Sequence, residues 1–270
     1  MKEKKAAKHP AGVMPSQKKD HTVYYRASIT FHGKHISLGS FPTARQAHRA
    51  YREASSILYD PNASIEKYPS DSMLSFEKRV CLINYRDNGI YIAHPIYIRP
   101  KMFYYYLSPE EILKFDVDDL FYYSSHKIMK RGGHLFVADY GAQVRIAGRY
   151  GIKRYAVEER DYRFKNGDPL DFRYSNIEIL NSYHGVRRYE DNNAISFRAL
   201  IHINGNYVIG VYPTEIEAAI AYNKAVDLLH QKGVQKNYAI NFIDGVSPSE
   251  YAQIYKQVKI SKRILDYTPK

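Results

Sequence analysis

The sequence has no tryptophan, a single cysteine and no long apolar run. One cysteine excludes an internal disulfide and a cysteine-based zinc site, and we expect Cys81 to be buried as a small apolar residue. No stretch approaches the roughly 20 apolar residues that span a bilayer. The first residues, MKEKKAAKHPAG, lack the apolar core of a secretory signal. We therefore expect an intracellular, cytoplasmic protein with no membrane partner.

Basic side chains are in clear excess. The 270 residues include 40 Lys and Arg against 28 Asp and Glu, a formal charge of +12. Residues 1–60 hold 11 basic and 4 acidic side chains, which is more than half of the surplus. Such a surplus indicates a polyanionic partner. The 27 tyrosines suit a core, an interface or stacking on nucleic-acid bases.

Residues 25–54 and 197–225 are two copies of one pattern. They align with a single one-residue offset, and eleven positions are identical. Chance explains that density poorly, so the sequence predicts an internal repeat. The most informative identities are Arg26/Arg198, Gly33/Gly205, Gly39/Gly210, Pro42/Pro213, Thr43/Thr214 and Tyr51/Tyr222.

Each copy predicts three antiparallel strands and one helix. Alternating apolar residues over 199–203 are typical of a half-buried strand, and the Asn-Gly pair at 204–205 of a tight turn into the next one. A further strand is expected at 184–189. Thr214 and Glu217 have the spacing of a capping box, which predicts the start of the helix.

The second copy resembles a known DNA-binding domain. Its motifs are GVRR, F-R-A-x-I, and Y-P-T-E-x-E-A-A-x-A-Y-N-x-A. These resemble the APETALA-two/ethylene-response-factor domain over residues 184–242 and, more weakly, over 11–65. In that family a three-stranded sheet lies in the DNA major groove and the helix packs behind it. The resemblance implies double-stranded DNA as the partner, with no cofactor and no small-molecule substrate.

The resemblance places candidate DNA-binding residues on the second copy. Arg187 and Arg188 fall on its first strand, Arg198 and His202 on the outward face of the second, and Asn206 on the third. Arginine can contact O6 and N7 of guanine with two hydrogen bonds, so the arginines are the expected base contacts.

Some positions depart from the family pattern. Leu200 replaces a usual polar residue on the outward face, and Phe197 and Val208 stand where the family carries tryptophan. In the first copy, Met14 and Pro15 replace the paired arginines. Its outward face is still expected to be polar and basic, and we assign it phosphate contacts. That set is Arg26, Thr30, His32, Lys34 and His35.

The middle region is less informative. The Asn-Gly pair at 88–89 predicts a hairpin turn, and Ser108-Pro-Glu-Glu predicts the start of a short helix. The acidic run at 116–119 has no second cluster at ligand spacing, so no metal site is expected.

Residues 134–181 resemble the C-terminal part of a phage- or intron-type His-Asn-His (HNH) endonuclease, on the motifs RYGIKRY and RFKNGDPLDFRYSNIEIL. That chemistry needs a histidine as general base and a bound metal ion. The resemblance implies a ββα fold, but its key positions hold Gly148, Arg163, Phe164 and Phe172, and only Asn176 is retained. We expect a degenerate nuclease fold with no catalytic residue.

Together these features predict an α+β protein of four segments: 1–65, 66–181 (including the HNH-like part), 182–245 and a C-terminal helix and tail at 246–270. The expected function is sequence-selective binding of double-stranded DNA, as a transcriptional regulator or a mobile-element accessory factor on the bacterial nucleoid. Two alternatives are a nicking endonuclease using carboxylates such as Asp161, and an RNA- or protein-binding module. The oligomeric state is not predicted.

Overall fold

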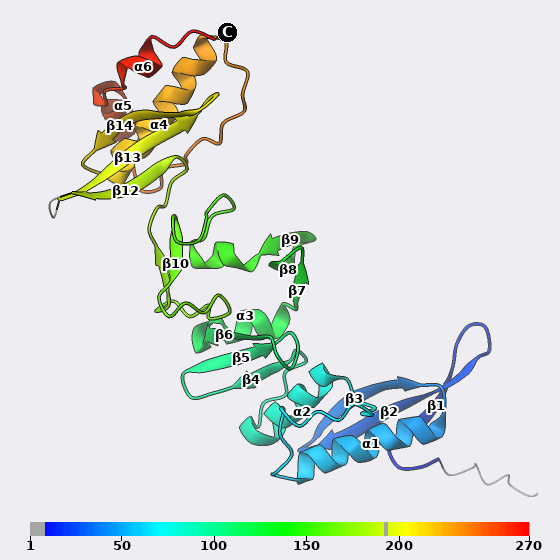
Figure 1. The fold of residues 1–270 in the computed structure, drawn as a ribbon. Helices are drawn as coiled ribbons and strands as arrows, with labels where there is room; N and C mark the ends of the chain where they lie inside the picture. Colours follow the sequence, from blue (N-terminus) through cyan, green and yellow to red (C-terminus); the bar gives the residue numbers. More distant parts are fainter. Residues whose placement is uncertain (1–8, 192–193, 270) are drawn as a thin grey trace, which may run out of the picture. The chain divides into compact units, whose positions relative to one another are not determined.

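The computed structural model describes residues 9–191 and 194–269 (Figure 1). The chain is of the α+β class, with helices and small sheets of two or three strands, as expected. By contacts it divides into two compact units. One runs through Val144 and includes Pro169–Tyr174, and the other contains Arg145–Asp168 and the chain from Ser175 onward. The four segments expected from the sequence remain a prediction. None of the described helices could cross a membrane.

The first unit begins with a sheet covered by one helix. Its elements are β1 (Val13–Gln17), β2 (Val23–Phe31), β3 (Lys34–Phe41) and α1 (Ala44–Tyr59). The strands are antiparallel in the order β1-β2-β3, and α1 lies along one face of the sheet (Figure 1). Ala47, Ala50 and Ala54 are fully buried on the inner stripe of α1. These small side chains let the helix approach the sheet closely.

The rest of the first unit differs from the sequence prediction in two places. Its elements are α2 (Phe76–Asn88), β4 (Ile96–Ile98), β5 (Met102–Tyr106), β6 (Ile112–Asp116), η1 (Val117–Asp119), α3 (Leu120–Ser125), β7 (Ile128–Arg131), β8 (His134–Asp139) and β9 (Ala142–Arg145).

The hairpin predicted at 88–89 is wrong. This Asn-Gly pair ends α2, and Gly89 adopts the left-handed conformation with φ 70° and donates its N–H to Tyr85 O. The same pair suits a helix C-terminus as well as a hairpin turn. Ser75, which accepts from Lys78 N–H as the N-cap of α2, was the overlooked signal. Cys81 lies within α2 and is buried, as predicted.

The helix predicted from Ser108 is also wrong. Ser108 Oγ does accept the N–H of Glu111, as an N-cap would. The following residues nevertheless form β6, in which Leu113 and Phe115 are completely buried and alternate with partly exposed neighbours. Pairing with β5 buries this period-two pattern, so the local capping signal does not propagate into a helix.

The second unit repeats the design of the first sheet. Its elements are η2 (Ile146–Tyr150), β10 (Tyr162–Phe164), β11 (Ile177–Ile179), β12 (Val186–Asp191), β13 (Ala194–His202), β14 (Asn206–Tyr212), α4 (Glu215–Gln231), α5 (Pro248–Gln257) and α6 (Lys262–Leu265). Strands β12-β13-β14 are antiparallel, and α4 packs on one face. The capping box of Thr214 and Glu217 is present, as predicted.

The two sheets match in detail, which supports the predicted repeat. Each has a register shift at the same place in its middle strand, after Ala27 and after Ala199. Each first strand is preceded by a glycine with φ 74°, Gly12 or Gly185. The space a side chain would need at these glycines is filled by a tyrosine ring of the covering helix, Tyr51 in one copy and Tyr222 in the other.

The ββα arrangement expected for the HNH-like segment is not present. Residues 134–181 are all described and contain no α-helix, and β11 is followed directly by the approach to β12. Strands β10 and β11 do form an antiparallel hairpin. Residues 180–185 connect β11 to β12 instead of forming a helix, and Asn181 in this connection accepts the backbone N–H of Arg188 on β12.

Candidate nucleic-acid interface

The sheet β12-β13-β14 has one covered face and one open face. Val186, Ala199 and Ile201 point into the core against α4 and are buried. Side chains alternate along a strand, so the neighbouring residues lie on the opposite face. Arg187 on β12 pairs in register with Arg198 on β13. The two predicted arginines are therefore adjacent on the open face.

Arg198 is held in place by an aromatic ring rather than by an acid. Its guanidinium carbon lies 4.5 Å from the ring centre of Tyr189, which is on the same face of β12. Within residues 9–191 and 194–269, neither Arg187 nor Arg198 forms an ion pair with a carboxylate. The positive charge of both guanidinium groups remains available to an anionic ligand.

Arg188 does not belong to this surface, which corrects the sequence prediction. It pairs in register with Phe197, a residue that packs toward the core, so it lies on the face opposite Arg187. Its Nη2 donates to Glu190 Oε1 at 2.6 Å, and its backbone N–H donates to Asn181. The adjacent arginines of the GVRR motif alternate between faces because β12 is a regular strand.

A polar pair closes the hairpin end of the open face. His202 Nδ1 lies 3.0 Å from Asn206 Oδ1, and the two residues are paired across β13 and β14. Lys236, which follows α4, donates from Nζ to His202 O at 2.9 Å and brings a further cation to this end. A cleft of about 420 Å³ adjoins it and includes Arg160 in its lining. Lys236 was not predicted, since only the tertiary fold brings its loop to the sheet.

The middle of the open face is apolar. Leu200 pairs directly with Val208, and Val211 pairs with Arg198. Val208 is 42% exposed and Val211 is 53% exposed. The open face therefore combines two guanidinium groups with a short aliphatic strip.

The open face of β1-β2-β3 is more polar. Arg26 Nη2 donates to Tyr24 OH at 3.0 Å, and Thr30 Oγ1 lies 3.4 Å from His35 Nδ1. Hydrogen bonds from Ser16 and Arg26 hold the pKa of the Tyr24 phenol below its ordinary value. Arg26, Thr30 and His35 thus lie together on the face where the sequence placed them.

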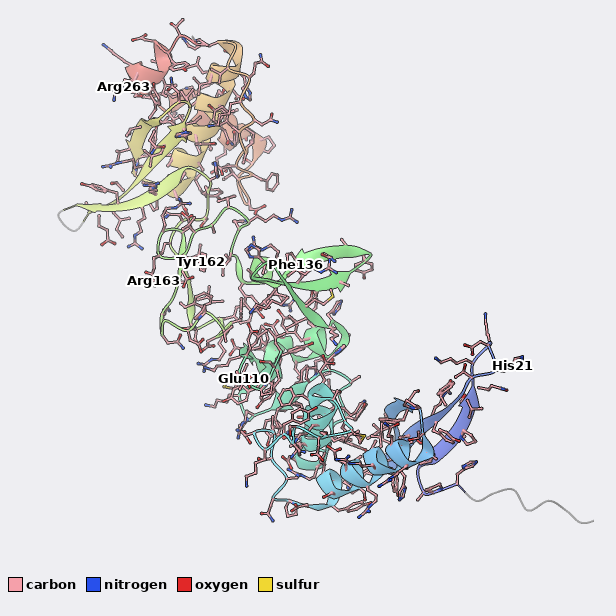
Figure 2. All side chains as sticks on the ribbon, turned by 45° about the vertical axis from the view of Figure 1, so that its right-hand side comes forward. His21, Glu110, Phe136, Tyr162, Arg163 and Arg263 are labelled. Carbon is pink, nitrogen blue, oxygen red and sulfur yellow. The ribbon has the colours of Figure 1, made fainter. Side chains whose placement is uncertain are left out.

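Two further residues of that set lie elsewhere. Lys34 shares the parity of the buried Ile36, and its Nζ lies 5.8 Å from the ring centre of Tyr91, so it is on the covered side. His32 is in the turn between β2 and β3 with φ 43°, so it belongs to neither strand. The first copy has one more residue in this hairpin than the second, which shifts the parity of β3 so that His35, and not Lys34, faces the open side. His21 stands near the tip of the β1–β2 hairpin (Figure 2) and was not predicted.

The HNH-like segment uses its polar groups structurally. Arg163, labelled in Figure 2, pairs with Glu178 across the β10–β11 hairpin at 2.8 Å. Asn176 is buried, and its Oδ1 accepts the N–H of Asn166 at 2.9 Å. Phe172 stacks on Phe115 in the core of the first unit.

Asp161 is the carboxylate on which the enzyme alternative depends. It is 5% exposed and accepts from Arg160 and from Val157 N–H. Burial alone would raise the pKa of Asp161, but these hydrogen bonds outweigh it and hold the pKa below the ordinary value. No cluster of three or more metal-ligating side chains occurs in the described part of the chain. Asp161 therefore acts as a hydrogen-bonded anchor for its loop.

A buried amide pair ties the open face to the rest of its unit. Asn223 on α4 and Asn241 exchange hydrogen bonds, with Asn223 Nδ2 donating to Asn241 O and Asn241 N–H donating to Asn223 Oδ1. The Asn241 side chain in turn bonds both backbone groups of His184. This network fixes the chain immediately before β12. Asn223 is part of the motif A-Y-N-x-A, but the motif does not reveal that Asn241 is its partner.

Comparison with known proteins adds no assignment: no family model, curated protein or solved structure matches this chain.

Proposed function

We propose that this protein binds double-stranded DNA, with the open face of β12-β13-β14 in the major groove. The observation that carries the proposal is the in-register pair Arg187 and Arg198, which stands on the open face of the sheet without a partner acid among the described residues. A sheet or two-stranded ribbon fits the major groove, and arginine is the side chain best suited to guanine.

For the first sheet, β1-β2-β3, we propose contacts with the DNA phosphates. It has the same architecture but a single arginine, Arg26, with hydroxyl and imidazole groups around it. Such groups suit phosphate contacts, which orient a protein on the duplex without reading sequence. Two linked sheets that engage one duplex would also gain affinity through their effective concentration. A role as a transcriptional regulator or an accessory factor of a mobile element belongs to this same proposal.

Arg187 and Arg188 are adjacent in sequence but lie on opposite faces of β12, so replacing each in turn tests which face binds DNA. Random duplexes are selected at about 150 mM salt, and the enriched sequence is then titrated with the Arg187→Ala, Arg198→Ala and Arg188→Ala variants. A bidentate guanine contact is worth about 1–3 kcal/mol. We expect the first two variants to lose that much and to relax selectivity at defined base pairs. Arg188→Ala removes only an exposed ion pair, worth about 0–1 kcal/mol, and should bind nearly as wild type.

Three outcomes would contradict the proposal. Equal losses for Arg187→Ala and Arg188→Ala would show that net charge, rather than this face, governs binding. Better competition by single-stranded DNA or RNA than by duplex would favour the RNA-binding alternative. Mg²⁺-dependent nicking of plasmid DNA that is lost in Asp161→Asn would favour the nuclease alternative.

A further inference from the structure

The two copies of the sheet differ systematically at three positions of the open face. Where the second copy has Leu200, Val208 and Val211, the register of the first copy places serines. Leu200 faces Val208 just as its serine counterpart on β2 faces the one on β3. The serines, in the same order, are Ser28, Ser37 and Ser40.

The difference lies on the open face and not in the core. Val208 and Val211 are about half exposed, while the core positions of both sheets are occupied by comparable apolar residues. The first copy has the same strands and register with serines at these positions, so the architecture of the sheet does not by itself require aliphatic side chains here. An aliphatic strip beside two arginines suits a ligand that is anionic and also offers small apolar groups.

Duplex DNA offers such groups in the major groove. The C5-methyl group of thymine projects there and is contacted by apolar side chains. Resting on the DNA binding proposed above, we infer that Leu200 and Val208 recognise thymine methyl groups. The site would thus read a combination of guanine, through Arg187 and Arg198, and thymine, through the aliphatic pair.

Strand geometry gives the spacing between the two readings. Arg198 and Leu200 are two residues apart on β13, which is about 6.8 Å along an antiparallel strand. Base pairs are stacked about 3.4 Å apart along the duplex. If β13 follows the groove, the thymine lies about two base-pair steps from the guanine. The first copy, with serines at these places, carries no such preference.

The first experiment leaves the protein unchanged and alters the DNA. The duplex enriched by selection is compared with the same duplex carrying uracil in place of thymine, which removes only the methyl groups. The wild-type protein should bind the uracil duplex about fourfold more weakly for each methyl group that it contacts. Substituting one thymine at a time should place the effect about two steps from an Arg198-dependent guanine.

Two variants then assign the effect to the aliphatic pair. The double variant Leu200→Ser/Val208→Ser converts the second sheet to the pattern of the first, and it should bind thymine and uracil duplexes equally. The control is Ile195→Ser, which also changes an exposed aliphatic residue of β13, 50% exposed, but on the opposite parity. It should retain the full preference for thymine.

The results separate this inference from the function on which it rests. Duplex binding that depends on Arg187 but not on the thymine methyl groups would overturn the inference and leave the proposed function standing. A thymine preference that persists in the double variant would also overturn it, because another residue would be reading the methyl. Failure to enrich any duplex would overturn both.

Discussion

Replacement of Gly185 by alanine tests how the open face is held in place. Gly185 precedes β12, has φ 74°, and its O accepts the N–H of Leu200 at 2.7 Å. A Cβ at this position would lie 2.5 Å from ring carbons of Tyr222 and 2.6 Å from Leu200 O. The strand that carries Arg187 would have to move away from both the helix and its neighbouring strand.

The size of the effect follows from two separate costs. A left-handed conformation costs a residue with a Cβ about 1–2 kcal/mol. Forcing extra atoms into a packed site costs about 1–3 kcal/mol more. We therefore expect Gly185→Ala to lower the free energy of unfolding by about 2–5 kcal/mol. Urea titration followed by far-UV circular dichroism would measure it.

Gly245 provides a matched control. Its φ is 76°, but no atom lies within 4 Å of the place where a Cβ would stand. Gly245→Ala should therefore carry the backbone cost alone, about 1–2 kcal/mol. Equal destabilisation by the two substitutions would refute the reasoning, because it would mean that contact with Tyr222 and Leu200 does not constrain the position of β12.

The remaining predictions concern buried and partly buried polar groups. Asn223→Ala leaves two backbone groups of the buried Asn241 unpaired, and we expect a loss of about 1–3 kcal/mol for each, measured by urea titration. An unchanged midpoint would contradict the role of the amide pair. Burial lowers the pKa of both His94 and His184 from 6.5, so the unfolded chain takes up protons more readily than the folded one. Stability should accordingly fall as the pH drops below about 6.5, and a flat profile from about pH 7.5 to 5 would exclude this effect.

Local patterns in the sequence were sufficient for the repeated units. The alternation on β13 and the capping box of Thr214 and Glu217 specify structure within one or two turns or strands, and both are present as predicted. The expected C-terminal helix is present as α5, which also begins with a capping box, formed by Ser247 and Glu250. Period and capping are local properties, so they can be read without the fold.

Some short motifs are compatible with two local structures, and the tertiary fold selects between them. The Asn-Gly pair at 88–89 suits either a hairpin or a helix end, and Ser108 suits either an N-cap or an isolated turn. Burial of the neighbouring apolar residues selected one in each case. The ββα arrangement predicted for the HNH-like segment is wrong for a related reason. Its polar motif positions form internal hydrogen bonds, and no helix follows the β10–β11 hairpin.

Some residues of the candidate surface follow from local sequence patterns, and others are placed there only by the tertiary fold. Alternation and the internal repeat were enough to place Arg187 and Arg198 on strands of one sheet. Only tertiary structure decided that Arg188 turns to the other face and meets Glu190, and that Lys236 joins the surface from a distant loop. The physical reason is that the parity of a strand depends on register and turn length, and contacts between distant segments depend on packing, neither of which a local pattern contains.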